Sequence, residues 1–246
     1  MSIIAQYNFA PTALARDNLL KEVKDARKIW VTGNTAIDAM RMTVRADYIH
    51  PELEWAANSR LILITAHRRE NLGEPMYHMF TAIKRVMEEH PDVKVIYPIH
   101  MNPQVRKVAR RVFGTGTDEA YKCEEARIHI IEPLDVLDFH NFMKHSYLIL
   151  TDSGGIQEEA PSLGKPVLVM RETTERPEGI KAGTLRLVGT SEDTIYREFN
   201  RLLNDPAVYN QMSEASNPYG DGHACERIAD ILENGVCERC LEVSQK

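Results

Sequence analysis

The chain has 246 residues, of which 43% are hydrophobic and 27% charged, and its formal net charge is −6 at pH 7. This length and composition predict one large globular domain or two small ones, with enough apolar residues for a core. The negative charge and the absence of a long basic run argue against nucleic acid or an anionic membrane surface as a partner. Because no apolar run has transmembrane length and no signal-peptide pattern opens the chain, we expect a cytoplasmic protein that does not contact a membrane.

Four cysteines, Cys123, Cys225, Cys237 and Cys240, fit a reducing compartment. Cys237 and Cys240 form a C-x-x-C pair near the C-terminus. A zinc site would need two more ligands at suitable spacing, and the sequence has no second pair. We therefore expect neither a metal nor a redox role for the pair, and nothing else in the sequence implies a cofactor.

The first sixty residues predict a small unit followed by a connection. The expected elements in chain order are a loop over 8–12, a helix over 13–23, a short strand over 28–32, a turn over 33–35 and a helix over 36–42. Residues 44–60 are polar and irregular, and they contain His50 followed by Pro51. They predict a connection or a short helix between two units.

From residue 60 onward, short apolar runs alternate with longer segments of helical spacing. The expected strands cover 61–65, 93–99, 127–131, 147–150, 166–170 and 184–188. The expected helices cover 76–89, 105–113, 136–143, 156–163, 192–203, 206–213 and 224–232. In the first of them Met76, Met79, Ile83 and Val86 share one face. This alternation predicts an α/β fold with a doubly wound, Rossmann-like parallel sheet.

Residues that can bind a ligand or catalyse, most of them polar, follow five of the expected strands. They are His67 with Arg68 and Arg69, then His100, then Pro133 with Leu134, then Ser153, and finally the segment 171–178. In a parallel sheet all of these positions lie at the carboxyl edge, where open α/β sheets bind ligands. Since several of the residues are basic, the pattern favours a phosphorylated ligand.

The segment 151–159, Thr-Asp-Ser-Gly-Gly-Ile-Gln-Glu-Glu, joins an expected strand to an expected helix. Ser153 suits a helix N-cap, and Gly154 and Gly155 let a phosphate approach the backbone closely. Glu158 and Glu159 stand one turn further on, where carboxylates can accept hydrogen bonds from sugar hydroxyls. Taken alone, an ordinary strand-to-helix turn explains the segment better, because its spacing is that of neither a dinucleotide fingerprint nor a P-loop.

Several motifs together resemble the non-hydrolysing UDP-N-acetylglucosamine 2-epimerases. They are Thr-Ala-His-Arg-Arg-Glu-Asn at 65–71, Tyr-Pro-Ile-His-Met-Asn-Pro at 97–103, Asp-Ser-Gly-Gly-Ile-Gln-Glu-Glu at 152–159, Thr-Glu-Arg-Pro-Glu at 174–178, Gly-Asn-Thr at 33–35 with Ile37 and Asp38, and Asn-Pro-Tyr-Gly-Asp-Gly at 217–222. The resemblance implies two Rossmann-like halves of the glycosyltransferase-B type with the ligand between them. Residues 1–44 match the end of the N-terminal half, and 45–246 match the C-terminal nucleotide-sugar-binding domain.

The resemblance also implies roles for particular residues. The diphosphate would be held by Ser153, Gly154 and Gly155, the ribose hydroxyls by Glu159, and the uracil by Phe139 and the backbone near Leu134. Arg176 would line the same substrate site. His67 matches a histidine implicated in catalysis, while Arg68 and His100 match residues that contact a second, activating UDP-N-acetylglucosamine.

The family reaction eliminates UDP to leave a 2-acetamidoglucal and adds UDP back with C2 inverted, which supplies cell-surface polysaccharide synthesis. The resemblance implies that its key carboxylates come from the N-terminal half, so we expect this chain alone to be weakly active or inactive. Family members are typically homodimers. Two alternatives stay open: a non-catalytic UDP-sugar-binding module or subunit that needs the N-terminal half in trans, and a glycosyltransferase of the same architecture. The motifs around His67 and Arg176 favour the epimerase over the transferase.

Overall fold

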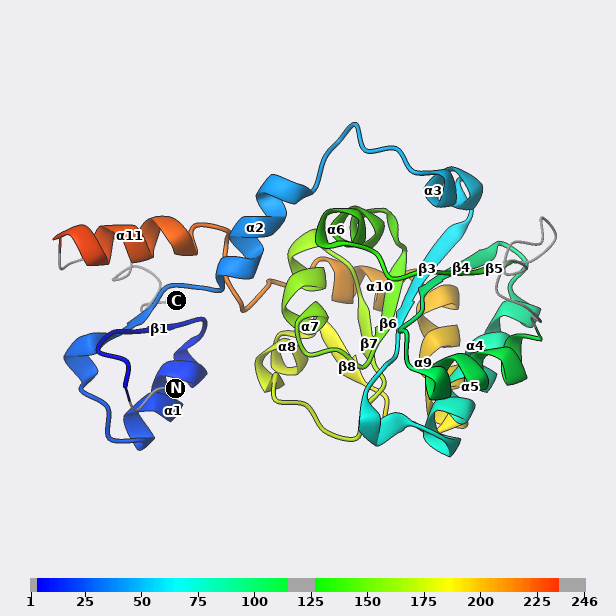
Figure 1. Ribbon diagram of the computed structural model, residues 1–246, viewed down its shortest axis with the longest axis horizontal. Helices are drawn as coiled ribbons and strands as arrows, with labels where there is room; N and C mark the ends of the chain where they lie inside the picture. Colours follow the sequence, from blue (N-terminus) through cyan, green and yellow to red (C-terminus); the bar gives the residue numbers. More distant parts are fainter. Residues whose placement is uncertain (1–3, 115–126, 235–246) are drawn as a thin grey trace. The chain divides into compact units, whose positions relative to one another are not determined.

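The computed structural model describes residues 4–114 and 127–234, and the chain divides into two units. The first unit combines residues 1–43 with 217–246, and the second comprises 44–216 (Figure 1). Cys123, Cys237 and Cys240 lie outside the described residues. Among the described helices, none combines the length and the apolar character that crossing a membrane requires.

The second unit is built on a six-stranded sheet in which every neighbouring pair of strands is parallel. The strands, in sheet order, are β5 (Ile128–Ile131), β4 (Val93–Pro98), β3 (Arg60–Thr65), β6 (Leu148–Thr151), β7 (Val167–Val169) and β8 (Leu185–Leu187). The predicted α/β fold with a parallel, Rossmann-like sheet is therefore confirmed. Two of its inner strands, β6 and β7, are buried along their whole length, as expected when helices cover both faces.

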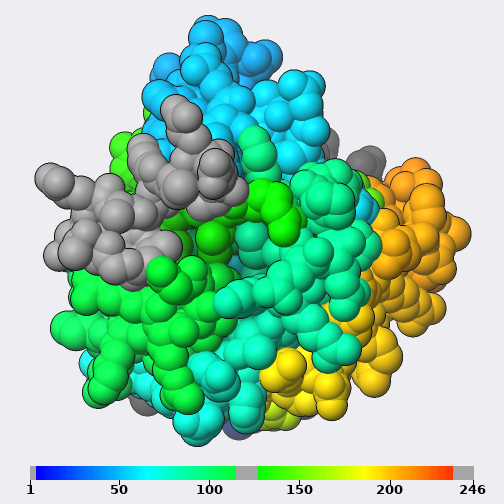
Figure 2. Space-filling view, turned by 90° about the vertical axis from the view of Figure 1, so that its right-hand side faces the viewer, coloured from blue at the N-terminus to red at the C-terminus, as the bar shows by residue number. Residues whose placement is uncertain are grey.

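Helices cover this sheet on both faces. They are α3 (Pro51–Ala56), α4 (Glu74–Glu89), α5 (Pro103–Phe113), α6 (Val136–His145), α7 (Ile156–Glu159), α8 (Pro177–Ala182), α9 (Glu192–Asn204) and α10 (Pro206–Ser213), with the 3₁₀ turns η2 (Arg69–Asn71) and η3 (Ala160–Leu163). In Figure 1, α4, α5 and α9 lie on one side of the sheet, and α6, α7 and α8 on the other. Figure 2 shows the first layer from outside, with α4 and α5 in teal and green beside α9 in yellow.

The core of the second unit lies between β3, β4 and the α4–α9 layer. The four residues predicted to share a face of α4, Met76, Met79, Ile83 and Val86, are all completely buried. Phe80 joins them and packs against Tyr97 with ring centroids 5.5 Å apart. The helical spacing of apolar residues thus predicted the buried face correctly.

The first unit contains a two-stranded parallel sheet, β1 (Asn8–Ala10) with β2 (Ile29–Val31), and the helices α1 (Ala13–Lys21), η1 (Ala26–Lys28), α2 (Thr35–Thr43) and α11 (Ala224–Asn234). The sequence interpretation of 8–12 as a loop was wrong for its first three residues. Phe9 pairs with Trp30 across the ladder. A strand of three residues forms here because of that distant partner, and nothing in the local sequence reveals it.

Helix α11 belongs with the first unit, although the sequence analysis assigned all of 45–246 to one domain. The Asp38 carboxylate on α2 accepts hydrogen bonds from the backbone N–H groups of Ala224 (3.1 Å) and Cys225 (2.7 Å), at the start of α11. Arg227 donates to the Thr32 carbonyl at 3.0 Å. These bonds tie the described part of 217–246 to the first unit rather than to the large sheet.

Two smaller expectations for the second unit can also be compared with the structure. The connection over 44–60 does contain a short helix, α3, whose N-cap is His50. The sequence analysis named 171–178 only as a polar segment after a strand and predicted no helix between 170 and 184, but Pro177 begins α8, and Gly183 ends it in the left-handed conformation. Proline at the first helical position and glycine after the last are the usual signals for such a helix.

Candidate functional site

The carboxyl ends of β3 and β4 bring two predicted site residues together. The rings of His67, after β3, and His100, after β4, stack with centroids 5.5 Å apart and planes 12° from parallel. The His67 side chain is 42% exposed, and His100 is exposed as well. Because β3 and β4 are adjacent parallel strands, the sheet itself places these two residues side by side.

Asp152, at the end of β6, fixes the position of the loop that carries His67. Its carboxylate is fully buried and accepts backbone N–H bonds from His67 (3.0 Å) and Arg68 (2.9 Å) and a side-chain bond from Asn71 (3.1 Å). His67 Nδ1 lies 3.5 Å from Asp152 Oδ1. The sequence analysis quoted Asp152 within a motif but gave it no role. The sequence could have pointed to Asp152, because an ionisable residue stands directly after an apolar run that predicts a buried strand.

Two arginine side chains flank the glycine turn after β6. A β-carbon at Gly154 would stand 3.6 Å from Cζ of Arg176 and 3.8 Å from Nη2 of Arg68. The side chains of both arginines are 31% exposed. The absence of a side chain at Gly154 therefore leaves room for a ligand atom within reach of two guanidinium groups, which bind phosphate well.

Ser153 does not cap the following helix as predicted, because the N-cap position is Gly155 and no side chain caps it. The backbone N–H of Ser153 donates instead to the Thr151 hydroxyl at 2.9 Å. Its carbonyl accepts a hydrogen bond from the Gln157 amide, also at 2.9 Å. The backbone around Ser153 is thereby held rigidly, and the expectation that Ser153 binds a phosphate does not depend on the capping role.

Glu159 lies close to the same turn, since a β-carbon at Gly155 would stand 3.5 Å from Glu159 Oε1. Burial, and to a lesser extent the neighbouring Glu158, raises the pKa of the Glu159 carboxyl. His140 on α6 approaches with Nε2 3.9 Å from Glu159 Oε2, and burial lowers the pKa of its imidazole. His140 is a residue that the sequence analysis missed. It lies within the predicted helix 136–143, and nothing in the local sequence marked it as a site residue.

Phe139 and Leu134, predicted to contact a base, are half-buried. Leu134 lies on the loop after β5 and Phe139 in the first turn of α6. Helix α6 is N-capped by Asp135 and packs against η3, so it runs from the loop after β5 towards the helix that follows the glycine turn. Phe139 directly precedes His140, the residue that approaches Glu159.

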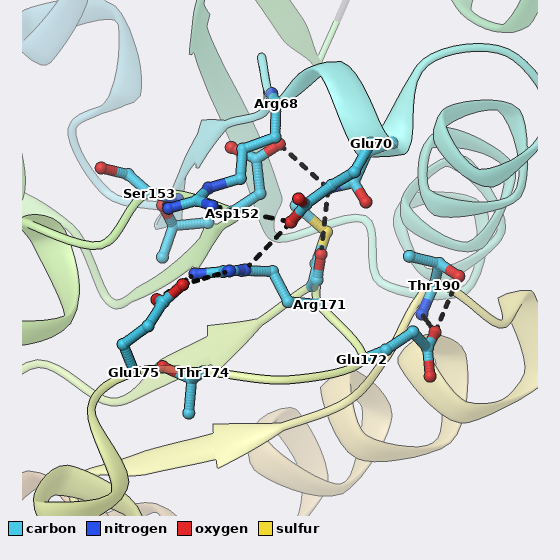
Figure 3. A network of polar contacts seen from close by, with 12 residues as sticks. Arg68, Glu70, Asp152, Ser153, Arg171, Glu172, Thr174, Glu175 and Thr190 are labelled. Carbon is cyan, nitrogen blue, oxygen red and sulfur yellow. Dashed lines mark hydrogen bonds and ion pairs between the residues drawn. The ribbon is translucent and has the colours of Figure 1, made fainter.

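Carboxylates surround the arginines of this edge (Figure 3). Arg176 donates from Nε to Glu158 Oε1 at 2.6 Å. Arg171, at the end of β7, makes a two-pronged pair with Glu175 at 2.9 and 3.1 Å. That pair is the main cause that lowers the pKa of the Glu175 carboxyl to about 2. The sequence analysis named Arg171 only as the first residue of a polar segment.

The remaining two motifs, 33–35 and 217–222, bind to each other within the first unit. Asn34 donates its backbone N–H to the Tyr219 carbonyl at 2.8 Å. A β-carbon at Gly220 would stand 3.2 Å from Gly33 Cα, and Gly220 has φ of +127°. Only glycine permits this approach of two backbones, so the structure gives these motif residues a packing role.

These features define a Rossmann-like domain whose carboxyl edge is suited to an anionic ligand. The fold matches the C-terminal domain of a group 1 glycosyltransferase from Francisella tularensis with a TM-score of 0.52, at 15% identity over 73% of this chain and 93% of that one. At this identity the likeness concerns the fold alone.

The family itself is established by closer similarities. The family model for UDP-N-acetylglucosamine 2-epimerase matches residues 1–233. The UDP-N-acetylglucosamine 2-epimerase of Bacillus subtilis is 59% identical over 93% of this chain, and that of Escherichia coli K12 is 46% identical over 94%. The chain belongs to the UDP-N-acetylglucosamine 2-epimerase family, and the resemblance recognised in the sequence is confirmed.

Solved structures agree with this assignment. A Staphylococcus aureus MnaA–UDP structure matches this chain with a TM-score of 0.88 at 51% identity. The match covers 94% of this chain and 61% of the Staphylococcus aureus chain. The Neisseria meningitidis UDP-GlcNAc 2-epimerase bound to UDP-GlcNAc matches 94% of this chain with a TM-score of 0.84 at 42% identity, and 62% of that chain is covered. The chain spans about three fifths of the length of the curated relatives it matches, such as 58% of the Bacillus subtilis protein.

Proposed function

We propose that this chain supplies the UDP-binding half of a UDP-N-acetylglucosamine 2-epimerase. The observation that carries the proposal is Gly154, flanked by Arg68 and Arg176 and followed by the Glu159 carboxylate near Gly155. The arginines provide charge for a diphosphate, and Glu159 provides an acceptor for ribose hydroxyls. The relatives crystallised with UDP and with UDP-GlcNAc support this choice of ligand.

In the proposed reaction a base removes the C2 proton of UDP-N-acetylglucosamine while the C1–O bond to UDP breaks, which leaves a 2-acetamidoglucal and UDP. The UDP oxygen then attacks C1, and an acid delivers a proton to the opposite face of C2, giving UDP-N-acetylmannosamine. Arg68 and Arg176 would stabilise the negative charge on the departing diphosphate. His67, exposed and held through its backbone by Asp152, would exchange a proton with the substrate or the departing diphosphate.

Binding is tested by calorimetry with UDP. We expect Glu159→Ala to weaken UDP binding roughly five- to tenfold, the loss of about one net hydrogen bond to the ribose. The matched control is Glu172→Ala, because Glu172 binds Thr190 (2.9 Å) on a neighbouring loop. Equal affinities of the Glu159 variant and the unchanged chain would remove Glu159 from the site.

Catalysis needs groups beyond the residues that this chain contributes. We expect little or no epimerisation by the chain alone, because the carboxylates proposed for C2 chemistry would come from the N-terminal half. Adding a polypeptide with that half should restore turnover, and His67→Ala should then lower kcat more than substrate binding. The assay is exchange of the C2 proton in heavy water, followed by NMR. Robust exchange by the chain alone would overturn the need for the second half.

A non-catalytic UDP-sugar-binding module is the second candidate, because the arginines beside Gly154 and the Glu159 carboxylate near Gly155 would bind a nucleotide whether or not the chain catalyses a reaction. The same exchange assay separates the two proposals. A module would still bind UDP but would show no exchange even when the N-terminal half is supplied. Whether the working assembly is a homodimer is measured by light scattering on the chain with and without that half.

A further inference from the structure

Six side chains of alternating charge form a continuous series of ion pairs that includes the two arginines flanking Gly154. In order, they are Arg68, Glu70, Arg171, Glu175, Arg176 and Glu158, and we call this set the charge chain. Its members come from the loops after β3 and β7 and from α7. Figure 3 shows its central part, with Arg171 between the carboxylates of Glu70 and Glu175.

Arg171 is the most buried member, with a side chain only 4% exposed. Its two terminal nitrogens are occupied by Glu175 at 2.9 and 3.1 Å. Its Nε is buried and makes no hydrogen bond to any residue that the structure describes. A buried donor without a hydrogen bond costs stability, so closing the 3.4 Å ion pair between this Nε and Glu70 into a hydrogen bond would be favourable.

The Nε group faces Glu70, a residue shared between two arginines. Glu70 Oε1 lies 3.4 Å from Arg171 Nε and 3.6 Å from Arg68 Nη1, and both distances exceed a normal hydrogen bond. The Glu70 side chain is 56% exposed and therefore has room to move. If an anion at Gly154 attracts Arg68, Glu70 loses one partner and can close on the unpaired Nε of Arg171.

We propose that Arg171 is a positioning residue for the diphosphate group of the bound nucleotide, acting through Glu70 on Arg68 and through Glu175 on Arg176. This proposal rests on the proposed UDP site. Arg171 holds Glu175 beside Arg176, whose Nη1 is 3.8 Å from Glu175 Oε2. When a phosphate attracts Arg68, the Nε–H of Arg171 donates to the Glu70 carboxylate instead, and this new hydrogen bond offsets the loss of the Arg68–Glu70 pair.

The experiment compares UDP with uridine, which has the same base and ribose but no phosphate. We expect Arg171→Met to weaken UDP binding roughly tenfold and to change uridine binding less than about twofold, measured by calorimetry and NMR titration. Arg171→Lys keeps the charge but lacks the planar fork, so its UDP affinity should fall only about threefold. The matched control Glu172→Gln, on the residue next to Arg171, should change neither affinity, because Glu172 pairs with Thr190 at 2.9 Å.

A direct readout is the NMR signal of the Arg171 Nε–H. Saturating UDP should shift this signal as Glu70 closes, and uridine should leave it in place. Failure of the unchanged chain to bind UDP would refute the proposed function itself. If UDP binds, three results would overturn the role of Arg171 alone: an unchanged UDP affinity in Arg171→Met, equal losses for UDP and uridine, or an Nε–H signal that UDP does not shift. Should Arg171→Met not fold, Arg171→Lys and the NMR signal decide the question.

Discussion

The two units use arginine in opposite ways, although both carry motifs of the same family. In the second unit, the side chains of Arg68 and Arg176 are 31% exposed and stand beside the open position at Gly154. In the first unit, Arg227 is 6% exposed and its guanidinium donates to the Thr32 carbonyl and to Asp221. Arg68 and Arg176 therefore keep donor groups accessible to the ligand proposed above. Arg227, which follows the 217–222 motif, instead uses its donors to hold the first unit together.

The two units also differ in the size of their hydrophobic cores. The second unit buries both faces of a six-stranded sheet, whereas the first has two strands of three residues each. In the first unit, the half-buried rings of Phe9 and Trp30 pack against Ile231 in a small hydrophobic cluster. Two-stranded sheets are marginal by themselves in water. We therefore expect the second unit to carry most of the stability of the chain.

The largest predicted effect tests this difference in the core. Phe80→Ala should lower the free energy of unfolding of the second unit by about 3–5 kcal/mol, because Phe80 is completely buried between Tyr97 and Phe113. Denaturant unfolding gives the loss, and amide hydrogen exchange shows where protection disappears. Trp30→Ala is the counterpart in the first unit.

We expect Trp30→Ala to speed exchange in β1 and β2 while leaving β3 and β6 protected. Peptides that cover β1 should already exchange faster than those that cover β3 in the unchanged chain. A comparable loss of protection in β3 on mutating Trp30 would contradict the independence of the two units.

The next effect separates the two kinds of arginine. Arg227→Met should destabilise the first unit by about 1.5–3 kcal/mol, the usual value for hydrogen bonds to charged groups, and should leave UDP binding unchanged. Arg68→Met should do the reverse: a stability change within about 0.5 kcal/mol and weaker UDP binding. Thermal unfolding and calorimetry on both variants check the pair. Weaker UDP binding in Arg227→Met would break the comparison.

This prediction has a pH dependence that follows from Asp221. Arg227 is the main cause that lowers the pKa of the Asp221 carboxyl from 3.8 to about 2 in the folded state. A depressed folded pKa gives stability that is present above the ordinary value and lost as the pH falls through the lower one. The stability difference between the unchanged chain and Arg227→Met should therefore shrink between pH 3.8 and about pH 2.

The sequence predicted the fold of the second unit because its signals are local. Apolar runs marked the strands, and helical spacing marked the buried face of α4. The misses share one physical cause: they depend on partners far away in the chain. Phe9 lies in a strand only because Trp30 lies beside it, and α11 joins the first unit only because Asp38 binds its first N–H groups.

For the site, the topology was sufficient to bring the right segments to one edge. Parallel strands dictate that His67 and His100 lie together, and their rings do stack. The ligand contacts of Ser153, Glu159 and Arg176 stay predictions. Burial of single charged groups could not be predicted in the same way. Asp152 and Arg171 stand in polar segments, and only the folded structure shows that one is fully buried and the other nearly so.

The smallest predicted effect concerns Glu159, where stability and binding should move in opposite directions. Burial, with Glu158 nearby, raises the pKa of Glu159 in the folded state above its ordinary 4.5. A raised carboxyl pKa means that the ionised form is disfavoured, so stability is fully present below pH 4.5 and declines as the pH rises through the folded pKa. Glu159→Gln removes that decline. The variant should therefore be more stable than the unchanged chain at pH 7, by less than about 1 kcal/mol, yet bind UDP more weakly. Thermal unfolding at pH 4 and pH 7, with and without UDP, measures both effects. A variant that is less stable at pH 7 would show that the Glu159 carboxylate stabilises the fold. The contrast between Glu159, whose charge is disfavoured by burial, and the paired charges of Arg227 and Asp221 in the first unit would then disappear.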